Sequence, residues 1–315
     1  MLCACLSVYA DWIDITSSIV VGDLNPSVSL GYHTQPAFAD LNKDGLVDLL
    51  VGWQGGIYGY RNTGTLNAPS WTRYSSWDIS STYGSPVLGD FDGDGDFDMI
   101  NTNNGYLYAY KNTGTSTAVW TRETAWENTL ASYVIAAGFA VNALGDLNGD
   151  GTLDLLVGCP DGTTIGFRNT SSTSPNWVRT TTFDTPTLSQ LGFSGTTYAM
   201  PEMADLDGDG DLDLLMGGLY EITAIENIGT ASAPVWQKNA NLAAGITTSW
   251  MDWLPGITDW NQDGNLDMML GGHSGYLKAY TLGLTPKVVP EVSSLLLCLS
   301  GLVFCFLWQK NSGKK

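Results

Sequence analysis

Five short acidic segments share one spacing of residue types that bind metal ions. They cover residues 40–48, 90–98, 146–154, 205–213 and 259–267, and each has Asp at its first, fifth and ninth positions. The third position is Asp or Asn, and the sixth is always Gly, which permits the positive φ of a sharp turn. Carboxylate, amide and carbonyl oxygens are the ligands that Ca²⁺ prefers. The repeated spacing predicts five calcium-binding loops, whereas a single copy would also suit an acidic, solvated turn.

These segments differ from the helix–loop–helix sites of EF-hands. An EF-hand loop ends with a bidentate Glu at its twelfth position and has a helix on either side. The ninth-position Asp must therefore close each site here, and the apolar residues that follow it predict a strand. A dockerin-type loop is excluded for the same reasons. The twelfth positions are Val51, Asn101, Val157, Met216 and Leu270.

The acidity of the chain is concentrated in these loops. The formal net charge is −19 over 315 residues. Three of the loops contain three Asp each and two contain five, which gives nineteen. Five bound divalent ions would leave a net charge of about −9, and such acidity argues against nucleic acid as a partner. The mutual repulsion of the carboxylates predicts a fold that depends on calcium.

The segments recur at intervals of 50 to 59 residues, a period that is typical of propellers and arrays. Each period contains four short strand patterns, here named a to d. Strand a enters the acidic loop, strand b leaves it as an apolar run, strand c alternates, and strand d begins at a Trp. Gly-rich turns separate them. The sequence therefore predicts an all-β fold, a single β-propeller of five four-stranded blades.

The fifth period lacks a Trp-led strand d, and a match for it lies at the other end of the chain. Residues 10–16, which include Trp12, have the pattern of this strand. An N-terminal strand that completes the last blade would close the ring and remove an open sheet edge. The propeller is therefore predicted to cover residues 11–284.

Two apolar segments flank the repeats. Residues 1–10 end in Val-Tyr-Ala, which is typical of the end of a secretory signal, with an ordinary N-terminal strand as the alternative. Residues 285–294 are predicted to form a linker with a short motif. Residues 295–315 begin with roughly 14–17 apolar residues and end in Lys, which predicts a hydrophobic anchor helix with its basic end in the cytoplasm.

The five loops with their flanking strands resemble the FG-GAP/VCBS repeats of integrin-α-like β-propellers, over residues 11–284. Integrin heads have seven blades, whereas five are predicted here. The resemblance implies that each calcium ion is held by the side chains at the first, third, fifth and ninth positions and by the seventh backbone carbonyl. The implied ligands are Asp40, Asn42, Asp44, Leu46 and Asp48; Asp90, Asp92, Asp94, Asp96 and Asp98; Asp146, Asn148, Asp150, Thr152 and Asp154; Asp205, Asp207, Asp209, Asp211 and Asp213; and Asp259, Asn261, Asp263, Asn265 and Asp267.

The C-terminal segment resembles the PEP-CTERM sorting signal of Gram-negative bacteria. Pro290 and Glu291, two Ser residues, the apolar run and the basic end match that signal, whereas Val292 stands where the motif has Pro. The resemblance implies export and a transient anchor in the inner membrane. Cleavage by an exosortase-like enzyme and delivery to the cell surface or extracellular matrix would follow.

Two classes of function remain open. The first is a non-catalytic binding or surface-structural module for a glycan, an extracellular polymer or a protein. The second is an extracellular polysaccharide-active enzyme, which would need two carboxylates roughly 5–9.5 Å apart. The acidic residues outside the loops show no paired or repeated spacing. No residue is therefore assigned a catalytic role, and the first class is favoured.

A ligand face is predicted opposite the calcium loops, on the b–c turns and on the connections from strand d to the next blade. Aromatic side chains there suit stacking on sugar rings, and neighbouring amides suit hydroxyl groups. Individual members could instead pack between blades. The candidates are Tyr32, His33, Trp53, Tyr83, Tyr198, Tyr220, Trp250 and His273.

Overall fold

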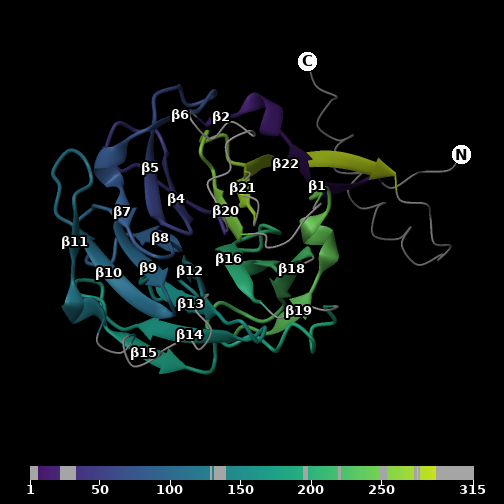
Figure 1. Ribbon diagram of the computed structural model, residues 1–315. Helices are drawn as coiled ribbons and strands as arrows, with labels where there is room; N and C mark the ends of the chain where they lie inside the picture. Colours follow the sequence, from purple (N-terminus) through teal and green to yellow (C-terminus); the bar gives the residue numbers. More distant parts are fainter. Residues whose placement is uncertain are drawn as a thin grey trace, which may run out of the picture. The chain divides into compact units, whose positions relative to one another are not determined.

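The computed structural model describes residues 6–21, 33–127, 130, 140–193, 198–218, 221–247, 254–272, 275 and 277–288. Ala10–Gly283 form one compact unit, and Met1–Tyr9 with Leu284–Lys315 form another. The larger unit is an all-β propeller of five blades, as predicted (Figure 1). The linker motif, with Pro290 and Glu291, and the predicted C-terminal helix lie outside the described residues. No helix among those described is long and apolar enough to cross a membrane.

Each blade is built from four antiparallel strands in the order a, b, c, d, from the inside outward. Blade 1 contains β3 (Gln35–Ala39), β4 (Asp48–Trp53), β5 (Gly56–Asn62) and β6 (Ser70–Arg73). Blade 2 contains β8 (Pro86–Gly89), β9 (Asp98–Asn103), β10 (Tyr106–Asn112) and β11 (Trp120–Arg122). Blade 3 contains β12 (Val141–Gly145), β13 (Asp154–Gly158), β14 (Thr164–Asn169) and β15 (Trp177–Thr180).

Blade 4 contains β16 (Met200–Ala204), β17 (Asp213–Gly217), β18 (Ile222–Asn227) and β19 (Trp236–Lys238). Blade 5 contains β20 (Leu254–Thr258), β21 (Asp267–Gly271), β22 (Leu277–Val288) and β1 (Leu6–Asp14). Blade 1 also has two short additions, β2 (Val20–Val21) beside β6 and β7 (Ile79–Ser80) beside β5. Among the described residues, four short 3-10 helices follow d strands: η1 (Thr16–Ser18), η2 (Ser75–Trp77), η3 (Thr124–Glu127) and η5 (Ala240–Ala243).

The a strands form the inner ring of the propeller (Figure 1). Each packs against the a strands of the two neighbouring blades, and β20 packs against β3, so the ring is closed. The b strands are buried along almost their whole length because a blade covers each of their faces. This burial explains why their sequences are continuous apolar runs instead of alternating ones.

Blade 5 is completed by the N-terminal strand, as the sequence predicts. β1 pairs with β22, and Thr16 just beyond it exchanges hydrogen bonds with the backbone of Ala279. β1 begins at Leu6, inside the segment interpreted as a signal remnant. β22 continues to Val288, so residues 285–288, which were predicted to begin the linker, form the end of this strand.

The repeated Asn at the end of strand c shapes the c–d loop. The Oδ1 atom of Asn62 accepts the backbone N–H groups of Gly64 and Ser70, at 3.0 and 3.1 Å. Asn112, Asn169 and Asn227 make the equivalent pair of bonds in blades 2 to 4. One side chain therefore bridges the two ends of each loop and sets where strand d begins.

A repeated ion pair connects strand d to the middle of strand c. Arg122 makes a bidentate ion pair with Glu127, at 2.9 Å for both contacts. Glu127 is buried and also accepts the backbone N–H of Ala109 in strand c, at 3.1 Å. Arg73 with Asp78 and Arg179 with Asp184 repeat this arrangement in blades 1 and 3. Blade 4 has Ala243 at the acidic position, so among the described residues this ion pair occurs only in blades 1 to 3.

Candidate metal-binding loops

All five acidic segments connect strand a to strand b, so they lie at one end of the propeller. The first-position Asp organises each loop. In blade 1, Asp40 accepts the N–H groups of Asp44 and Gly45, at 3.1 and 2.8 Å. The bond from the sixth-position glycine recurs in every loop at 2.8–3.0 Å. One carboxylate therefore folds the backbone around the place where the others gather.

Positive φ angles occur at two positions of each loop. The sixth-position glycines have φ between 85° and 95°, which confirms that the turn requires a positive φ at this position. The fourth position is also left-handed, and it is glycine in three loops but Lys43 and Gln262 in the other two, with φ of 59° and 55°. A non-glycine residue in this region costs roughly 1–2 kcal/mol. The spacing of the Asp residues alone does not reveal the left-handed φ at the fourth position.

The ninth-position Asp lies at the buried base of each loop. In blades 1 to 4 it accepts the N–H of the second loop residue and that of the Asn that ends strand c. In blade 5 the equivalent residue, Leu282, donates instead to the carbonyl of Leu266. Both carboxylate oxygens of Asp267 are fully buried and have no hydrogen-bond partner among the described residues.

Burial raises the pKa of every ninth-position carboxyl. The pKa rises to about 7 for Asp48 and Asp98, and to about 6 for Asp154, Asp213 and Asp267. Removal from water disfavours the charged form, and the neighbouring loop carboxylates add to the effect. Thr281 and the Trp260 N–H lower the pKa of Asp267 without meeting ordinary hydrogen-bond geometry. A bound cation would favour the charged form of these groups and offset the cost of their burial.

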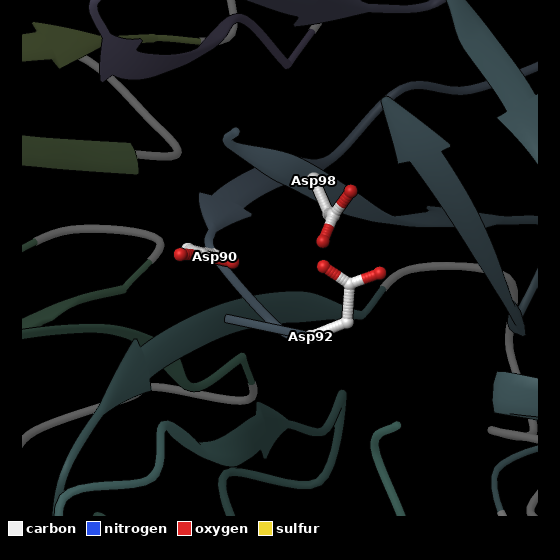
Figure 2. A group of neighbouring side chains, drawn as sticks. All are labelled: Asp90, Asp92 and Asp98. Atoms are coloured by element: carbon white, nitrogen blue, oxygen red, sulfur yellow. The ribbon is translucent and has the colours of Figure 1, made fainter. Parts of the chain in front are cut away.

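Two loops bring three carboxylates close enough to share one ion. Oxygen atoms of Asp90, Asp92 and Asp98 lie within 4.8 Å of one another, and the side chains of Asp92 and Asp98 point toward each other (Figure 2). The same limit holds for Asp205, Asp207 and Asp209 in blade 4. Clustered carboxylates at this spacing suit a hard divalent cation. The buried, unpartnered oxygens of Asp267 also fit such an ion.

The third and seventh positions show how the remaining loop residues are arranged. In blade 1 the Asn42 amide donates to Asp48 at 3.0 Å, and its Oδ1 atom is buried without a partner among the described residues. The seventh-position N–H donates to the fifth-position Asp in all five loops. Where the seventh residue is acidic, its carboxylate is engaged elsewhere: Asp96 pairs with Lys43, and Asp211 accepts the Ala231 N–H.

The sequence interpretation missed a set of basic residues at these loops. Arg61, Lys111 and Arg168 stand on strand c, just before the repeated Asn, and each pairs with the fifth-position Asp of its own loop. The nitrogen–oxygen distances are 3.0, 3.1 and 2.8 Å. The sequence does contain a signal for these residues, because a basic residue precedes Asn-Thr in three of the repeats.

On the predicted ligand face, the structure brings two candidates together. The Trp53 carbonyl accepts the Gly84 N–H, at 3.0 Å, and Gln54 donates to the Tyr83 hydroxyl at 3.5 Å. Tyr83 also donates its backbone N–H to Asn103 of blade 2. Trp53 packs against Tyr58, with ring centroids 5.1 Å apart. Trp53, Gln54, Tyr83 and Asn103 lie together at the junction of blades 1 and 2, at least partly exposed, and are named the Trp53 cluster below.

The other candidates for this face fall into two groups. His33 precedes the buried Thr34, which bonds to Gly272 of blade 5, and it has a left-handed φ of 61°. Tyr198 packs against a small buried cluster of Val141, Met200 and Leu254, which is the interblade packing that the sequence left open as an alternative. Tyr32, Tyr220, Trp250 and His273 lie outside the described residues.

Comparison with known proteins identifies the repeats. The FG-GAP-like repeat model matches residues 40–101, 90–157 and 146–216, which together exceed half of the chain. No curated protein matches the chain. Among solved structures, a Tc holotoxin pore of Photorhabdus luminescens is 15% identical, with a TM-score of 0.42, and the match covers 89% of this chain and 15% of the toxin chain.

A second solved structure is that of an Agrocybe aegerita lectin that specifically recognises non-reducing terminal N-acetylglucosamine. It is 16% identical with a TM-score of 0.42, and the match covers 88% of this chain and 80% of the lectin. The matched repeats and the five-bladed ring together define the class of protein. The chain belongs to the FG-GAP-like repeat family of β-propellers.

Proposed function

We propose that this propeller is an exported, calcium-stabilised module that binds an extracellular glycan, polymer or protein, or contributes to surface structure, without catalysis. The repeated loop carries the proposal: all five loops have a buried Asp at the ninth position, and two of them bring three carboxylates within 4.8 Å of one another. Acidic groups arranged in this way are unfavourable without a cation. A bound ion would therefore supply charge neutralisation and fix the loop in place.

The ligands of that ion would be the loop oxygens. The side chains at the first, third, fifth and ninth positions and the seventh carbonyl would hold it in each blade. Extracellular calcium modules bind with dissociation constants on the order of 10⁻⁴–10⁻³ M, which suits loops that are mostly exposed. The family to which the chain belongs supports calcium as the ion.

The Trp53 cluster is the part of the opposite face that best supports ligand binding. It combines an aromatic ring, a phenol and two amide side chains at the junction of two blades. An aromatic face gives stacking area for a sugar ring, and amides discriminate its hydroxyl groups. Glycan is therefore the ligand class we favour over protein.

The C-terminal sequence supports surface delivery. Its apolar run and basic end would hold a precursor in the inner membrane, and the Val-Pro-Glu-Val segment stands immediately before that run. An exosortase-like enzyme would cleave near Pro290 and release the propeller to the surface. Intact-mass measurement of the extracellular protein tests this step, since material that still ends at Lys315 would contradict it.

A glycan array tests the binding function. The array would be incubated with the full chain in the presence of calcium. The glycans that bind it would then be tested with a Trp53→Ala variant. Loss of binding in that variant is expected, whereas Phe97→Ala, an exposed aromatic in an acidic loop at the other end of the propeller, should bind normally. Release of reducing sugar ends from bound polysaccharide would instead favour the enzyme alternative.

A further inference from the structure

The five acidic loops differ at one position outside the nine-residue repeat. This is the strand c residue that stands opposite the ninth-position Asp in the β-ladder. It is Arg61, Lys111 and Arg168 in blades 1 to 3, and Glu226 and Thr281 in blades 4 and 5. Each basic residue pairs with its loop, so three loops already contain a positive charge.

The basic side chains occupy oxygen atoms that a metal ion would need. In blade 3, one carboxylate oxygen of Asp150 accepts the Thr152 N–H, and the other pairs with Arg168. In blade 2, Lys111 contacts both Asp92 and Asp94, so its ammonium group bridges two carboxylates as a cation would. A metal ion entering these loops must displace or repel the resident charge.

Blade 4 has the opposite electrostatics. Glu226 stands where blades 1 to 3 have Arg or Lys, beside a loop that contains five Asp. Its negative charge repels that of Asp207, the third residue of this loop. Asn239 donates to one Glu226 oxygen at 2.8 Å, which fixes the carboxylate in place.

In blade 5 the strand c residue is uncharged, and the buried carboxylate of Asp267 makes no ordinary hydrogen bond among the described residues. Thr281 stands directly opposite Asp267, and neither Asp267 oxygen has a hydrogen-bond partner among the residues that the structure describes. A fully buried, unpartnered carboxylate that faces an acidic loop is costly unless a cation pairs with it. This loop therefore has the most to gain from a bound ion.

We propose that the strand c residue sorts the five loops into two classes of calcium site. The loops of blades 4 and 5 take the ion first, and the loops of blades 1 to 3 are held in a weaker state by Arg61, Lys111 and Arg168. The inference rests on the proposed calcium binding. At about 20 for the effective dielectric constant, one unit charge near a divalent ion changes the affinity by about tenfold or more.

Equilibrium dialysis of the full chain against buffered free calcium tests the two classes. About two ions should bind at roughly tenfold lower free calcium than the other three. Glu226→Lys should move one ion from the tight to the weak class, and Arg168→Thr should move one in the other direction. Arg168→Lys keeps the charge and should leave the binding curve unchanged.

The outcomes separate the inference from the function on which it rests. No bound calcium would overturn both. Five ions that bind with one affinity, or a binding curve that Arg168→Thr leaves unchanged, would overturn the two classes and leave calcium binding intact. Because Glu226→Lys could disturb folding, melting curves of the calcium-free variants are compared first, and Arg168→Thr alone is sufficient to decide.

Discussion

The indole Nε1–H of Trp12 donates to the backbone carbonyl of Leu242, at 3.1 Å, across 230 positions of sequence. The backbone N–H of Trp12 also bonds to Ala244, at 2.8 Å. The first strand of the chain is therefore tied both to β22 of its own blade and to the connection that follows blade 4. Ring closure depends on this strand.

Trp12→Ala should weaken the whole propeller. The Trp12 side chain is fully buried, and truncation of such a side chain costs about 3–5 kcal/mol. Ile13 on the same strand is exposed, so Ile13→Ala should change the free energy of unfolding by less than about 0.5 kcal/mol. Denaturant titrations of both variants measure the difference. Equal stabilities would show that the ring closes in another way.

Deletion of residues 11–18 removes the last four residues of β1, including Trp12, together with η1. An exposed edge on β22 would then be available for pairing with other chains, so aggregation and loss of a single cooperative transition are expected. Size-exclusion chromatography with light scattering provides the measurement. A truncated protein that stays monomeric and equally stable would contradict both ring closure and the five-blade arrangement.

Calcium removal should lower the melting temperature by many degrees. Binding to the native state alone adds stability in proportion to the logarithm of the ion concentration over its dissociation constant. Thermal melts in excess chelator and in millimolar calcium should therefore differ widely. A magnesium arm controls for simple screening, since Mg²⁺ demands a stricter octahedral geometry. Identical curves in chelator and calcium would rule out a structural role for the ion.

The stability of the calcium-free protein should fall as the pH rises. The pKa values of Asp48 and Asp98 are raised from 3.8 to about 7, so the folded chain binds protons more tightly than the unfolded chain. Their contribution is fully present below pH 4 and is lost as the pH rises through 6 to 7. Calcium replaces those protons, so its stabilising effect should grow over the same range. Melting curves from pH 5 to 8, with and without calcium, test both signs.

Much of the fold could be predicted from the repeat. The apolar runs after each acidic loop predicted strands such as β4 and β17, because a strand that is buried on both faces is apolar along its whole length. The missing strand d in blade 5 pointed to Trp12. By contrast, β22 reaches Val288 through residues whose sequence is typical of a linker.

The loop interpretation was limited in the same way. Positions that recur in all five copies were found, whereas Arg61 and Glu226 were not, because they vary between blades and lie outside the nine-residue repeat. Their proximity to the loops depends on the β-ladder register, which a linear spacing does not contain. The pairing of Gln54 with Tyr83 is likewise set by tertiary contact and not by a linear spacing.

Gln262→Gly should stabilise the protein by about 1 kcal/mol, because Gln262 has the left-handed φ that glycine adopts without strain. The substitution removes an exposed 3.3 Å hydrogen bond to Gly45, which is a small loss. Gln262→Ala keeps the strain, loses the same bond, and should be slightly destabilising. Denaturant titrations in saturating calcium compare the two variants. A glycine variant no more stable than the alanine variant would contradict the role of backbone strain here.

Glu127→Ala should destabilise the protein by about 1–3 kcal/mol, because it leaves the buried Ala109 N–H without its acceptor and Arg122 without its bidentate partner. Glu221 provides the control, since its ion pair with Lys238 is partly exposed and should be worth less than about 1 kcal/mol. The free energies of unfolding of Glu127→Ala and Glu221→Ala, measured in saturating calcium, decide the comparison. Equal losses would mean that the acid after strand d is only a surface charge and does not connect strands c and d.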